Sequence, residues 1–240
     1  MTGGRIILSA RSIVKEYIVG AITLEVLKGL DIDLFEGQIV AIIGESGAGK
    51  STLLNILGML DRPTSGSLDM NGENLMGKSD AELAVYRNRF VGFIFQFHHL
   101  LPEFNALENV LMPALISGSN GPDTEKRAVG LLEKVGLGGR LDHRPGELSG
   151  GELQRVAVAR ALMNEPSVIF ADEPSGNLDR QNSEMLHSLI WGLARENNSS
   201  FVVVTHDLGL ARRADRIMEL RDGLLREING ESIGAEFTVP

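Results

Sequence analysis

The eight residues from Gly44 to Ser51 constrain the fold of this chain more than any other segment. They read Gly-Glu-Ser-Gly-Ala-Gly-Lys-Ser, which matches G-x-x-x-x-G-K-[ST], between a strand-like run at Ile39–Ile43 and an apolar helical run at Thr52–Leu60. In that context glycines let backbone N–H groups turn inward around phosphate oxygens, and the helix N-terminus attracts the same anion. The segment predicts an α/β fold with a phosphate-binding loop at the end of a strand.

Lys50 and Ser51 give this phosphate loop (Gly44–Ser51) its chemistry. We expect Lys50 to reach the β- and γ-phosphates of a nucleoside triphosphate and Ser51 to offer its hydroxyl to Mg²⁺. The predicted nucleotide-binding residues of this region are Gly44, Glu45, Ser46, Gly47, Ala48, Gly49, Lys50, Ser51 and Thr52.

Composition narrows the class of protein. The 240 residues are enough for one substantial domain, and the net charge of −9 has the wrong sign for a protein that holds nucleic acid by its phosphates. The absence of cysteine excludes disulfides and cysteine metal sites. We see no secretory h-region and no apolar run of about 20 residues, so any link to a membrane is expected to go through a partner.

The hydrophobic pattern predicts both kinds of sheet. Ile39–Ile43, Val168–Ala171 and Phe201–Val204 are apolar on both faces, as buried parallel strands are. Leu30–Leu34 alternates apolar and acidic residues, which is typical of a half-buried strand. Two Asn-Gly or Asp-Gly pairs predict tight hairpin turns, at Asn71-Gly72 and Asp222-Gly223.

Helices are expected in the middle of the chain. Asp123 is predicted to cap a helix that stops at Gly136, and Ser79 to cap another. The expected organisation is one domain, 1–240, with three parts: an antiparallel β subdomain (about 1–36 and 62–76), a parallel-sheet nucleotide-binding core (37–61 and 166–240) and a helical subdomain (about 90–165).

An acidic pair ends one of the buried strands. Asp172 fits a Mg²⁺ ligand, directly or through water, and Glu173 could then polarise an attacking water as the catalytic base. The alternative is a solvated Asp-Glu turn before Pro174, which the nearby phosphate loop disfavours.

A second anion site is predicted at the start of a helix. Ser149 as N-cap with Glu152 three residues later forms a capping box, and Gly150-Gly151 leaves the helix N-terminus uncovered. Glycines there cost stability, which suggests that something approaches the backbone closely. Glu152 alone can be explained by capping.

With these motifs in order, the chain resembles the ATP-binding cassette family, whose core is of the P-loop NTPase type. The further matching residues are Tyr17 for adenine stacking, Gln96 for Mg²⁺ and water, the signature segment Leu148–Glu152 (Leu148, Ser149, Gly150, Gly151, Glu152), the dimer loop Ser175–Asp179 (Ser175, Gly176, Asn177, Leu178, Asp179) and His206 as γ-phosphate sensor. The metal ligands implied are Ser51, Gln96 and Asp172. Without the resemblance, Tyr17 could equally be an aromatic residue that packs on its strand. His206 would then be interpreted as a capping or surface residue. Glu152 departs from the more frequent Gln, which caps equally well.

The resemblance implies an ATPase that works as a head-to-tail dimer with two ATP molecules, each between the phosphate loop of one copy and the signature segment of the other. Two transmembrane permease subunits would be driven by it, with the chain peripheral on the cytoplasmic face of a bacterial inner membrane.

The stretch after Gln96 is similar to the ATPases of lipoprotein-releasing transporters. Its apolar and aromatic residues suggest a partner contact made by Phe97, His98, Leu100 and Leu101, although they could equally pack the helical part. The related alternatives are macrolide-efflux and cell-division ATPases of the same family. Outside transport, DNA-maintenance ATPases and tandem-cassette translation factors are disfavoured, because the chain is acidic and carries one set of motifs.

Overall fold

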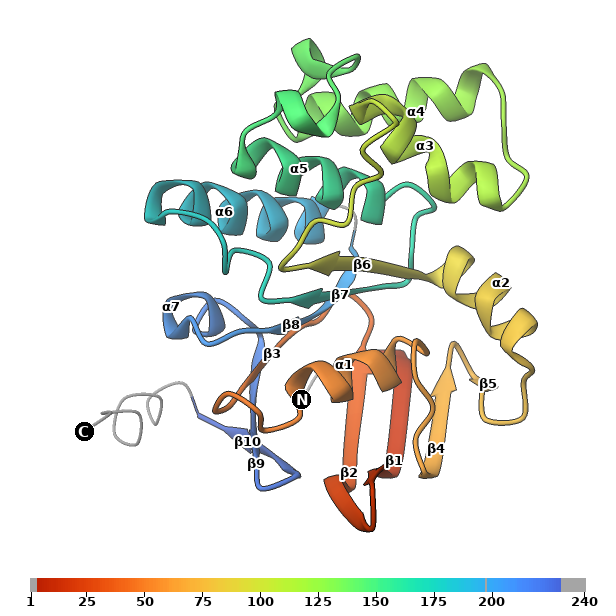
Figure 1. Cartoon of the computed structure of the whole chain (residues 1–240), viewed down its shortest axis with the longest axis vertical. Coiled ribbons are helices and arrows are strands. Elements are labelled where there is room, and N and C mark those ends of the chain that lie inside the picture. The colour runs from red at the N-terminus through yellow and green to blue at the C-terminus, as the bar shows by residue number, and fades with distance from the viewer. Residues whose placement is uncertain (1–3, 197, 230–240) are drawn as a thin grey trace. The chain divides into compact units, whose positions relative to one another are not determined.

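The apolar runs expected to be buried strands are strands in the computed structural model, which describes residues 4–196 and 198–229. The chain divides into two compact units (Figure 1). The first unit is Met1–Leu83 with Ser200–Pro240, and the second is Ala84–Ser199. Parallel strands, antiparallel strands and helices are all present, so the predicted α/β class is confirmed.

An antiparallel sheet occupies part of the first unit. Its strands lie in the order β2-β1-β4-β5 and are β1 (Ile6–Val19), β2 (Ile22–Phe35), β4 (Ser65–Met70) and β5 (Glu73–Asn74). Leu30, Ile32 and Leu34 are buried as their alternation predicts. Asn71 and Gly72 both have positive φ, 52° and 80°, which is the conformation of the predicted tight turn between β4 and β5.

Parallel strands carry the phosphate loop in the same unit. β3 (Ile39–Ile43) runs parallel to β8 (Ser200–Val204) on one side and to β9 (Arg216–Arg221) on the other, and β10 (Leu224–Ile228) closes a hairpin with β9. Every residue of β3 and β8 is buried. The short helix α7 (Leu208–Ala211) follows β8, and Asp222-Gly223 forms the predicted turn.

Helix α1 follows the loop but differs in its bounds from the predicted Thr52–Leu60. It spans Lys50–Leu57, because Gly49 in a left-handed conformation already turns the chain into its first turn. It ends early because Gly58 is its C-cap and Met59 has a positive φ of 60°. Four apolar residues of this helix, Leu53, Leu54, Ile56 and Leu57, are buried.

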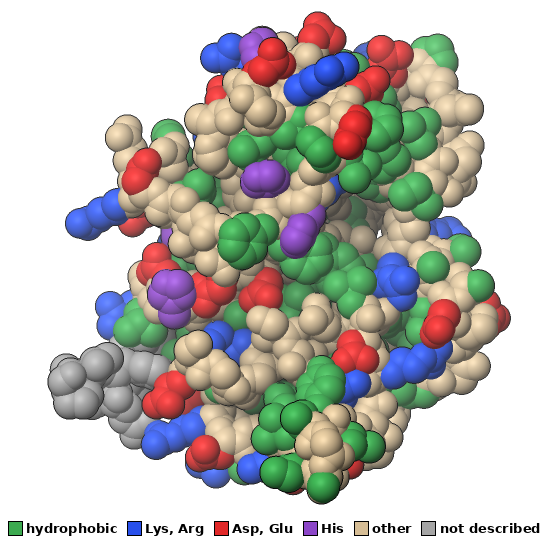
Figure 2. Space-filling model, in the orientation of Figure 1, with side chains coloured by type: hydrophobic (Ala, Val, Ile, Leu, Met, Phe, Trp, Pro, Cys, Tyr) green, Lys and Arg blue, Asp and Glu red, His purple; other side chains and the backbone are tan. Residues whose placement is uncertain are grey.

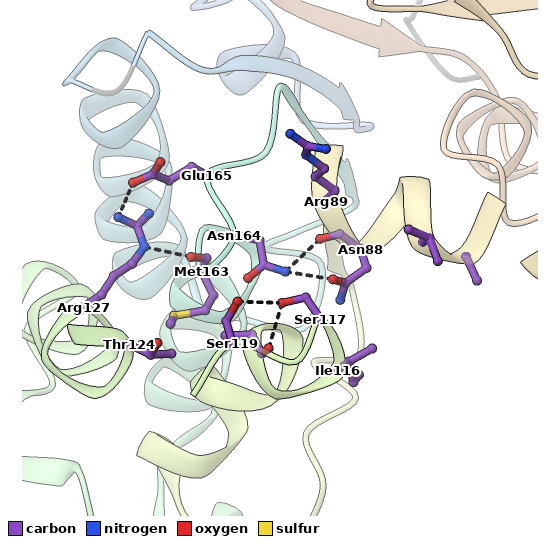
Figure 3. A pocket seen from close by; sticks show the side chains of 13 residues that line it. Asn88, Arg89, Ile116, Ser117, Ser119, Thr124, Arg127, Met163, Asn164 and Glu165 are labelled. Atoms are coloured by element: carbon purple, nitrogen blue, oxygen red, sulfur yellow. Dashed lines mark hydrogen bonds and ion pairs between the residues drawn. The ribbon is translucent and has the colours of Figure 1, made fainter. Parts of the chain in front are cut away.

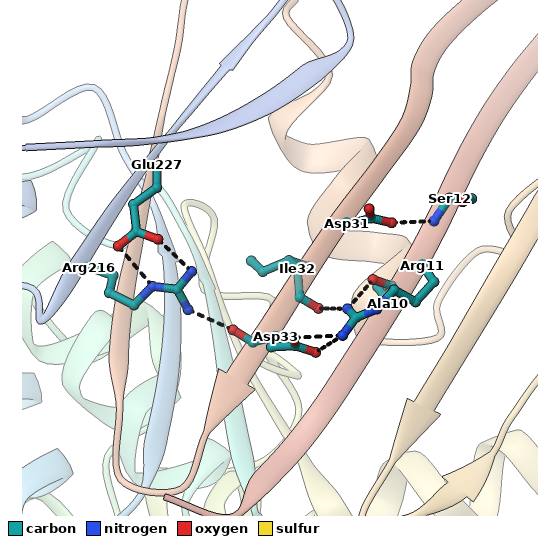
Figure 4. Close-up of polar contacts among 8 residues, drawn as sticks. All are labelled: Ala10, Arg11, Ser12, Asp31, Ile32, Asp33, Arg216 and Glu227. Atoms are coloured by element: carbon teal, nitrogen blue, oxygen red, sulfur yellow. Dashed lines mark hydrogen bonds and ion pairs between the residues drawn. The ribbon is translucent and has the colours of Figure 1, made fainter. Parts of the chain in front are cut away.

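A polar network ties the antiparallel sheet to the β9–β10 hairpin (Figure 4). Arg216 pairs with Glu227 at 2.8 Å and donates to the Asp33 carbonyl oxygen at 2.8 Å. Arg11 Nη2 donates to both carboxylate oxygens of Asp33, at 2.7 and 2.6 Å. Burial alone would raise the pKa of Asp33, but the hydrogen bonds from Arg11 and Ser9 lower it. The network fixes strands on both sides of the phosphate loop.

The second unit contains a parallel strand pair and most of the helices. α2 (Asp80–Phe90) leads into β6 (Val91–Phe95), which runs parallel to β7 (Val168–Asp172). The other helices are α3 (Ala106–Ile116), α4 (Pro122–Lys134), α5 (Gly150–Ala161) and α6 (Arg180–Glu196), with short 3₁₀ turns at Gly138–Arg140 and Pro145–Glu147. α3 packs on α4 and α5.

The predicted helix caps are confirmed at Ser79 and wrong at Asp123. The Ser79 hydroxyl accepts from the Glu82 N–H at 3.4 Å, and Glu82 accepts from the Ser79 N–H at 2.8 Å. α4 instead starts at Pro122 with Gly121 as N-cap, so Asp123 lies inside the first turn. Proline at the first helical position carries a preset φ, and it moves the start upstream of Asp123. Gly136, with φ of 76°, ends α4 as predicted.

Hydrophobic side chains gather at the tip of the β1–β2 hairpin (Figure 2). Ile18, Val19, Ile22 and Leu24 are each more than half exposed.

In the described part of the chain, no helix is both long and apolar enough to cross a membrane.

Candidate nucleotide-binding and catalytic site

The phosphate loop is closed by its own lysine. Lys50 Nζ donates to the carbonyl oxygens of Gly44 and Glu45, at 2.8 and 2.9 Å, and so draws the two ends of the loop together. The loop then continues into α1, whose first N–H groups lack partners within the helix. This places an ammonium group and a helix N-terminus at one curved stretch of backbone, which is the arrangement that phosphate oxygens require.

Two glycines of the loop are required by its shape. Gly49 has φ of 100°, and a Cβ there would lie 2.8 Å from Val26 Cγ1. A Cβ at Gly44 would lie 2.4 Å from the Leu220 carbonyl oxygen. The loop therefore lies so close to the Val26 side chain of β2 and to the Leu220 backbone of β9 that a side chain at either glycine would clash.

A cavity of about 460 Å³ lies beside the loop in the first unit. Gly44–Ala48 form one wall, and the remaining lining comes from β2 and the β9–β10 hairpin. The backbone of the loop is thus accessible on this side.

Tyr17 is oriented by a charged pair. Its hydroxyl lies 3.1 Å from Asp61 Oδ2, and the Lys15 ammonium stands 4.9 Å from the ring centroid while it also bonds Asp61 at 2.8 Å. Burial alone would raise the pKa of Asp61, but the hydrogen bonds from Lys15, the Arg62 N–H and Tyr17 lower it. Tyr17 is 39% exposed, so a ring held on one face by a cation still presents surface to a ligand.

His206 leaves the sheet beside the phosphate loop. β3 and β8 are parallel neighbours, with Ile42 opposite Val204, so the loop and His206 follow the same ends of adjacent strands. Asp207 caps α7 by accepting from the Gly209 and Leu210 N–H groups, at 2.8 and 3.1 Å. His206 itself is exposed between the buried Thr205 and this cap. Its backbone is therefore fixed while its ring remains accessible.

Gln96 and the acidic pair come together in the second unit. Phe95 of β6 is opposite Asp172 of β7, so Gln96 and Glu173 follow directly at the same edge. Glu173 has a positive φ of 45°, an uncommon conformation for this residue type that is often found at functional sites. Across the residues that the structure describes, no group of three or more His, Cys, Asp or Glu side chains could hold a metal. The amide of Gln96 and the carboxylate of Asp172 are oxygen donors, which suit Mg²⁺.

The dimer loop packs on Gln96. Gln96 Nε2 donates to Asn177 Oδ1 at 3.2 Å, and Asn177 Nδ2 donates to the Gln96 carbonyl oxygen at 3.1 Å. A Cβ at Gly176 would lie 2.8 Å from Gln96 Nε2. The first residue of the loop also contacts a buried side chain. Ser175 Oγ lies 2.7 Å from Nε2 of the buried His187 in α6. Sequence reasoning missed His187, whose only signal is a histidine within the apolar stripe of α6.

The signature segment has the predicted capping box. Ser149 Oγ accepts from the Glu152 N–H at 3.3 Å, and Glu152 Oε2 accepts from the Ser149 N–H at 2.8 Å. The structure explains the two glycines, Gly150 and Gly151, differently. A Cβ at Gly151 would lie 2.9 Å from Asn182 Oδ1, so the chain's own α6 explains this glycine. A Cβ at Gly150 would lie 3.8 Å from Leu178 Cδ2, an ordinary contact, and the residue is exposed, so packing within the second unit does not require a glycine here.

The predicted partner contact is only partly on the surface. Phe97 is 64% and Leu101 39% exposed, whereas Leu100 is buried. Asn109 of α3 fixes this stretch by bonding both the N–H and the carbonyl oxygen of Leu101. His98 is half-buried, and burial, followed by the nearby Arg160 charge, lowers its pKa.

A further cavity, of about 740 Å³, lies in the second unit between α2, α3, α4 and the end of α5 (Figure 3). Its polar floor is bonded within the chain: Arg127 Nε donates to the Met163 carbonyl oxygen at 2.8 Å, and Asn164 Nδ2 to the Asn88 carbonyl oxygen at 2.8 Å. Val85 and Ile116, which also line it, are 72% and 69% exposed. The surface left for a ligand is therefore mainly apolar.

The predicted site residues thus form two groups. The phosphate loop, Tyr17 and His206 belong to the first unit. The second unit carries Gln96, the acidic pair, the signature segment and the dimer loop.

Comparisons with known proteins identify the family. A model of the ABC transporter family matches residues 27–176. The lipoprotein-releasing system ATP-binding protein LolD of Xanthomonas oryzae pv. oryzae is 52% identical over 222 residues, which cover 92% of this chain and 91% of that protein. The protein of the same name from Porphyromonas gingivalis is 54% identical over 219 residues, covering 91% and 98%.

A solved structure agrees with these relatives. It is a dimeric ATP-binding cassette in a post-hydrolysis state, bound to ADP and Pi, with a TM-score of 0.86 and 38% identity, covering 93% of this chain and 98% of that one. The P-loop NTPase fold predicted from the sequence is thereby confirmed. The chain belongs to the ABC transporter family, as one of its ATP-binding and ATP-hydrolysing cassettes.

Proposed function

We propose that the chain is the ATPase subunit of a bacterial transporter that releases lipoproteins from the inner membrane toward the outer membrane. The observation that carries this proposal is the likeness to the LolD proteins at about half of all positions across nine-tenths of the chain. A macrolide-efflux or cell-division complex is the alternative within the same family.

Binding of ATP is assigned to the first unit. The phosphate loop surrounds the phosphates, Lys50 neutralises the β- and γ-phosphates, and Tyr17 stacks on adenine. The loop is already closed by Lys50 and fixed by Gly44 and Gly49, so little reordering accompanies binding. Mg²⁺ would supply further positive charge against the phosphate oxygens, and oxygen donors for it are offered by Ser51 in the first unit and by Gln96 and Asp172 in the second.

Hydrolysis is assigned to Glu173 and His206. Glu173 accepts a proton from the attacking water, and His206 holds the γ-phosphate. The fixed backbone on either side of each residue supports this, because general-base catalysis depends on a side chain held within hydrogen-bond reach of its proton.

The second half of each site comes from a second copy. The signature segment Leu148–Glu152 would contact the γ-phosphate bound by the other copy, and Ser175–Asp179 would contact the opposite dimer loop. Gly150 supports this, because it is exposed and packing within the second unit leaves room at its backbone, with Leu178 Cδ2 3.8 Å from an added Cβ.

Membrane subunits are the proposed partners, two per dimer, with the chain peripheral on the cytoplasmic face of the inner membrane. Phe97, His98 and Leu101 supply the contact, and Leu100 supports it from beneath because it is buried. Val85 and Ile116 at the cavity of the second unit offer a second apolar surface.

The test is reconstitution of the chain with the membrane subunits of a lipoprotein-releasing transporter, in vesicles that carry a labelled lipoprotein. We expect ATP-dependent release of the lipoprotein to an acceptor, and loss of release with the Lys50→Ala variant because the phosphates lose their main counter-charge. The Phe97→Asp variant should keep ATP binding but lose co-purification with the membrane subunits. Stimulation by a macrolide, with no lipoprotein release, would overturn the proposal in favour of the efflux alternative.

A further inference from the structure

Glu152 places a carboxylate at the helix N-terminus that is proposed to receive a phosphate. Its Oε2 accepts from both the N–H and the hydroxyl of Ser149, each at 2.8 Å. The N-terminus of α5 attracts anions. A carboxylate bound there lowers the positive potential of the helix N-terminus and repels an approaching phosphate.

The carboxylate stays ionised under all ordinary conditions. The hydrogen bonds from the Ser149 backbone and hydroxyl, together with that from Arg140, lower the pKa of Glu152 to about 2. Its negative charge therefore cannot be removed by protonation when a phosphate approaches. A nearby cation can balance this charge.

Arg140 is placed to balance the negative charge of Glu152. Its Nε donates to Glu152 Oε1 at 3.1 Å, the oxygen that does not cap the helix. Arg140 Nη1 lies 3.1 Å from His143 Nε2, so the guanidinium is held at two ends. The 3₁₀ turn at Gly138–Arg140 carries it, with the Arg140 N–H bonded to the Leu137 carbonyl oxygen at 2.9 Å. The Arg140 side chain is 48% and the Glu152 side chain 18% exposed, so the pair lies at the surface of the second unit.

We propose that Arg140 is a positioning residue, which balances the charge of Glu152 and holds its carboxylate on the capping donors so that the N-terminus of α5 can accept the γ-phosphate of an ATP bound by a second copy. This rests on the proposed function of the signature segment. Arg140 does not touch the nucleotide, and acts only through Glu152. In a cassette with an uncharged Gln at this position, the arginine would have no charge to balance.

The test is a double-mutant cycle in the Glu173→Gln background, where hydrolysis does not dissolve the dimer. Light scattering measures the ATP concentration at which half of the chains are dimeric. The effect of Arg140→Gln on this concentration is determined twice, once with Glu152 retained and once in the Glu152→Gln background. A glutamine retains the capping box, so the cycle isolates the charge. Lys134→Gln serves as the control, because it removes the cation of another surface pair, with Glu196, in the same unit.

We expect Arg140→Gln to raise the ATP concentration for dimerisation about tenfold when Glu152 is present, and less than about twofold in the Glu152→Gln background. Lys134→Gln should have no effect in either background. Equal effects of Arg140→Gln in the two backgrounds, or none in either, would overturn the inference. ATP binding by monomers should be unchanged throughout, which excludes misfolding. If the Glu173→Gln chain does not dimerise with ATP at all, the proposed function fails instead.

Discussion

His187 Nε2 lies 2.7 Å from Ser175 Oγ, and this hydrogen bond joins the buried face of α6 to the first residue of the dimer loop. His187 is 2% exposed. Ser175 is two residues beyond Glu173, and the Gly176 N–H bonds the Glu173 carbonyl oxygen at 3.0 Å. The bond therefore anchors the turn that carries the proposed base.

Removal of either partner should destabilise the chain. We expect Ser175→Ala to lower the free energy of unfolding by about 1–3 kcal/mol, because a polar group of His187 loses a buried hydrogen bond. Urea unfolding measures this loss. A double variant, Ser175→Ala with His187→Phe, should recover part of it, since both sides of this contact are then apolar. A double variant as unstable as the sum of the two single ones would contradict the assignment.

Gly49→Ala should abolish ATP binding while leaving much of the fold intact. The φ of 100° is unfavourable for alanine, and its Cβ would lie 2.8 Å from Val26 Cγ1. The loop must therefore shift away from the shape that holds phosphate. Calorimetric titration with ATP measures the effect, and Gly139→Ala is the control, because that position has open space. Unchanged affinity in Gly49→Ala would show that the loop shape is not required.

Acid should remove the stabilising contribution of Glu152. Its folded-state pKa of about 2 lies below the ordinary glutamate value of 4.5, so the contribution is complete above pH 4.5 and is lost as the pH falls toward 2. We expect the difference in unfolding free energy between the wild type and Glu152→Gln to shrink between these values. Urea titrations at pH 6 and pH 3 provide the comparison. A difference that grows on acidification would contradict the low pKa.

The sequence predicts those features that depend on residues close together in the chain. The phosphate loop, the buried strands at Ile39–Ile43 and Phe201–Val204, and the capping box at Ser149 each depend on spacing within one short segment. Their local patterns were enough because the same residues make the contacts.

Features made by residues far apart in the chain were missed. Arg140 meets Glu152 from a separate 3₁₀ turn, and His187 meets Ser175 across the start of α6. The glycine at 151 was interpreted as room for a ligand, whereas Asn182 of α6 fills that space. The local sequence around each of these residues does not predict its partner, because only tertiary packing brings the two residues of each pair together.

ATP is proposed to join two copies of the chain, and Glu173 to end the joined state by hydrolysis. The most direct measurement is the molar mass of Glu173→Gln by light scattering with ATP and with ADP, alongside its rate of phosphate release. We predict a dimer with ATP, a monomer with ADP, and turnover reduced by about two to four orders of magnitude. Wild-type turnover, or a mass that does not change with ATP, would contradict the account.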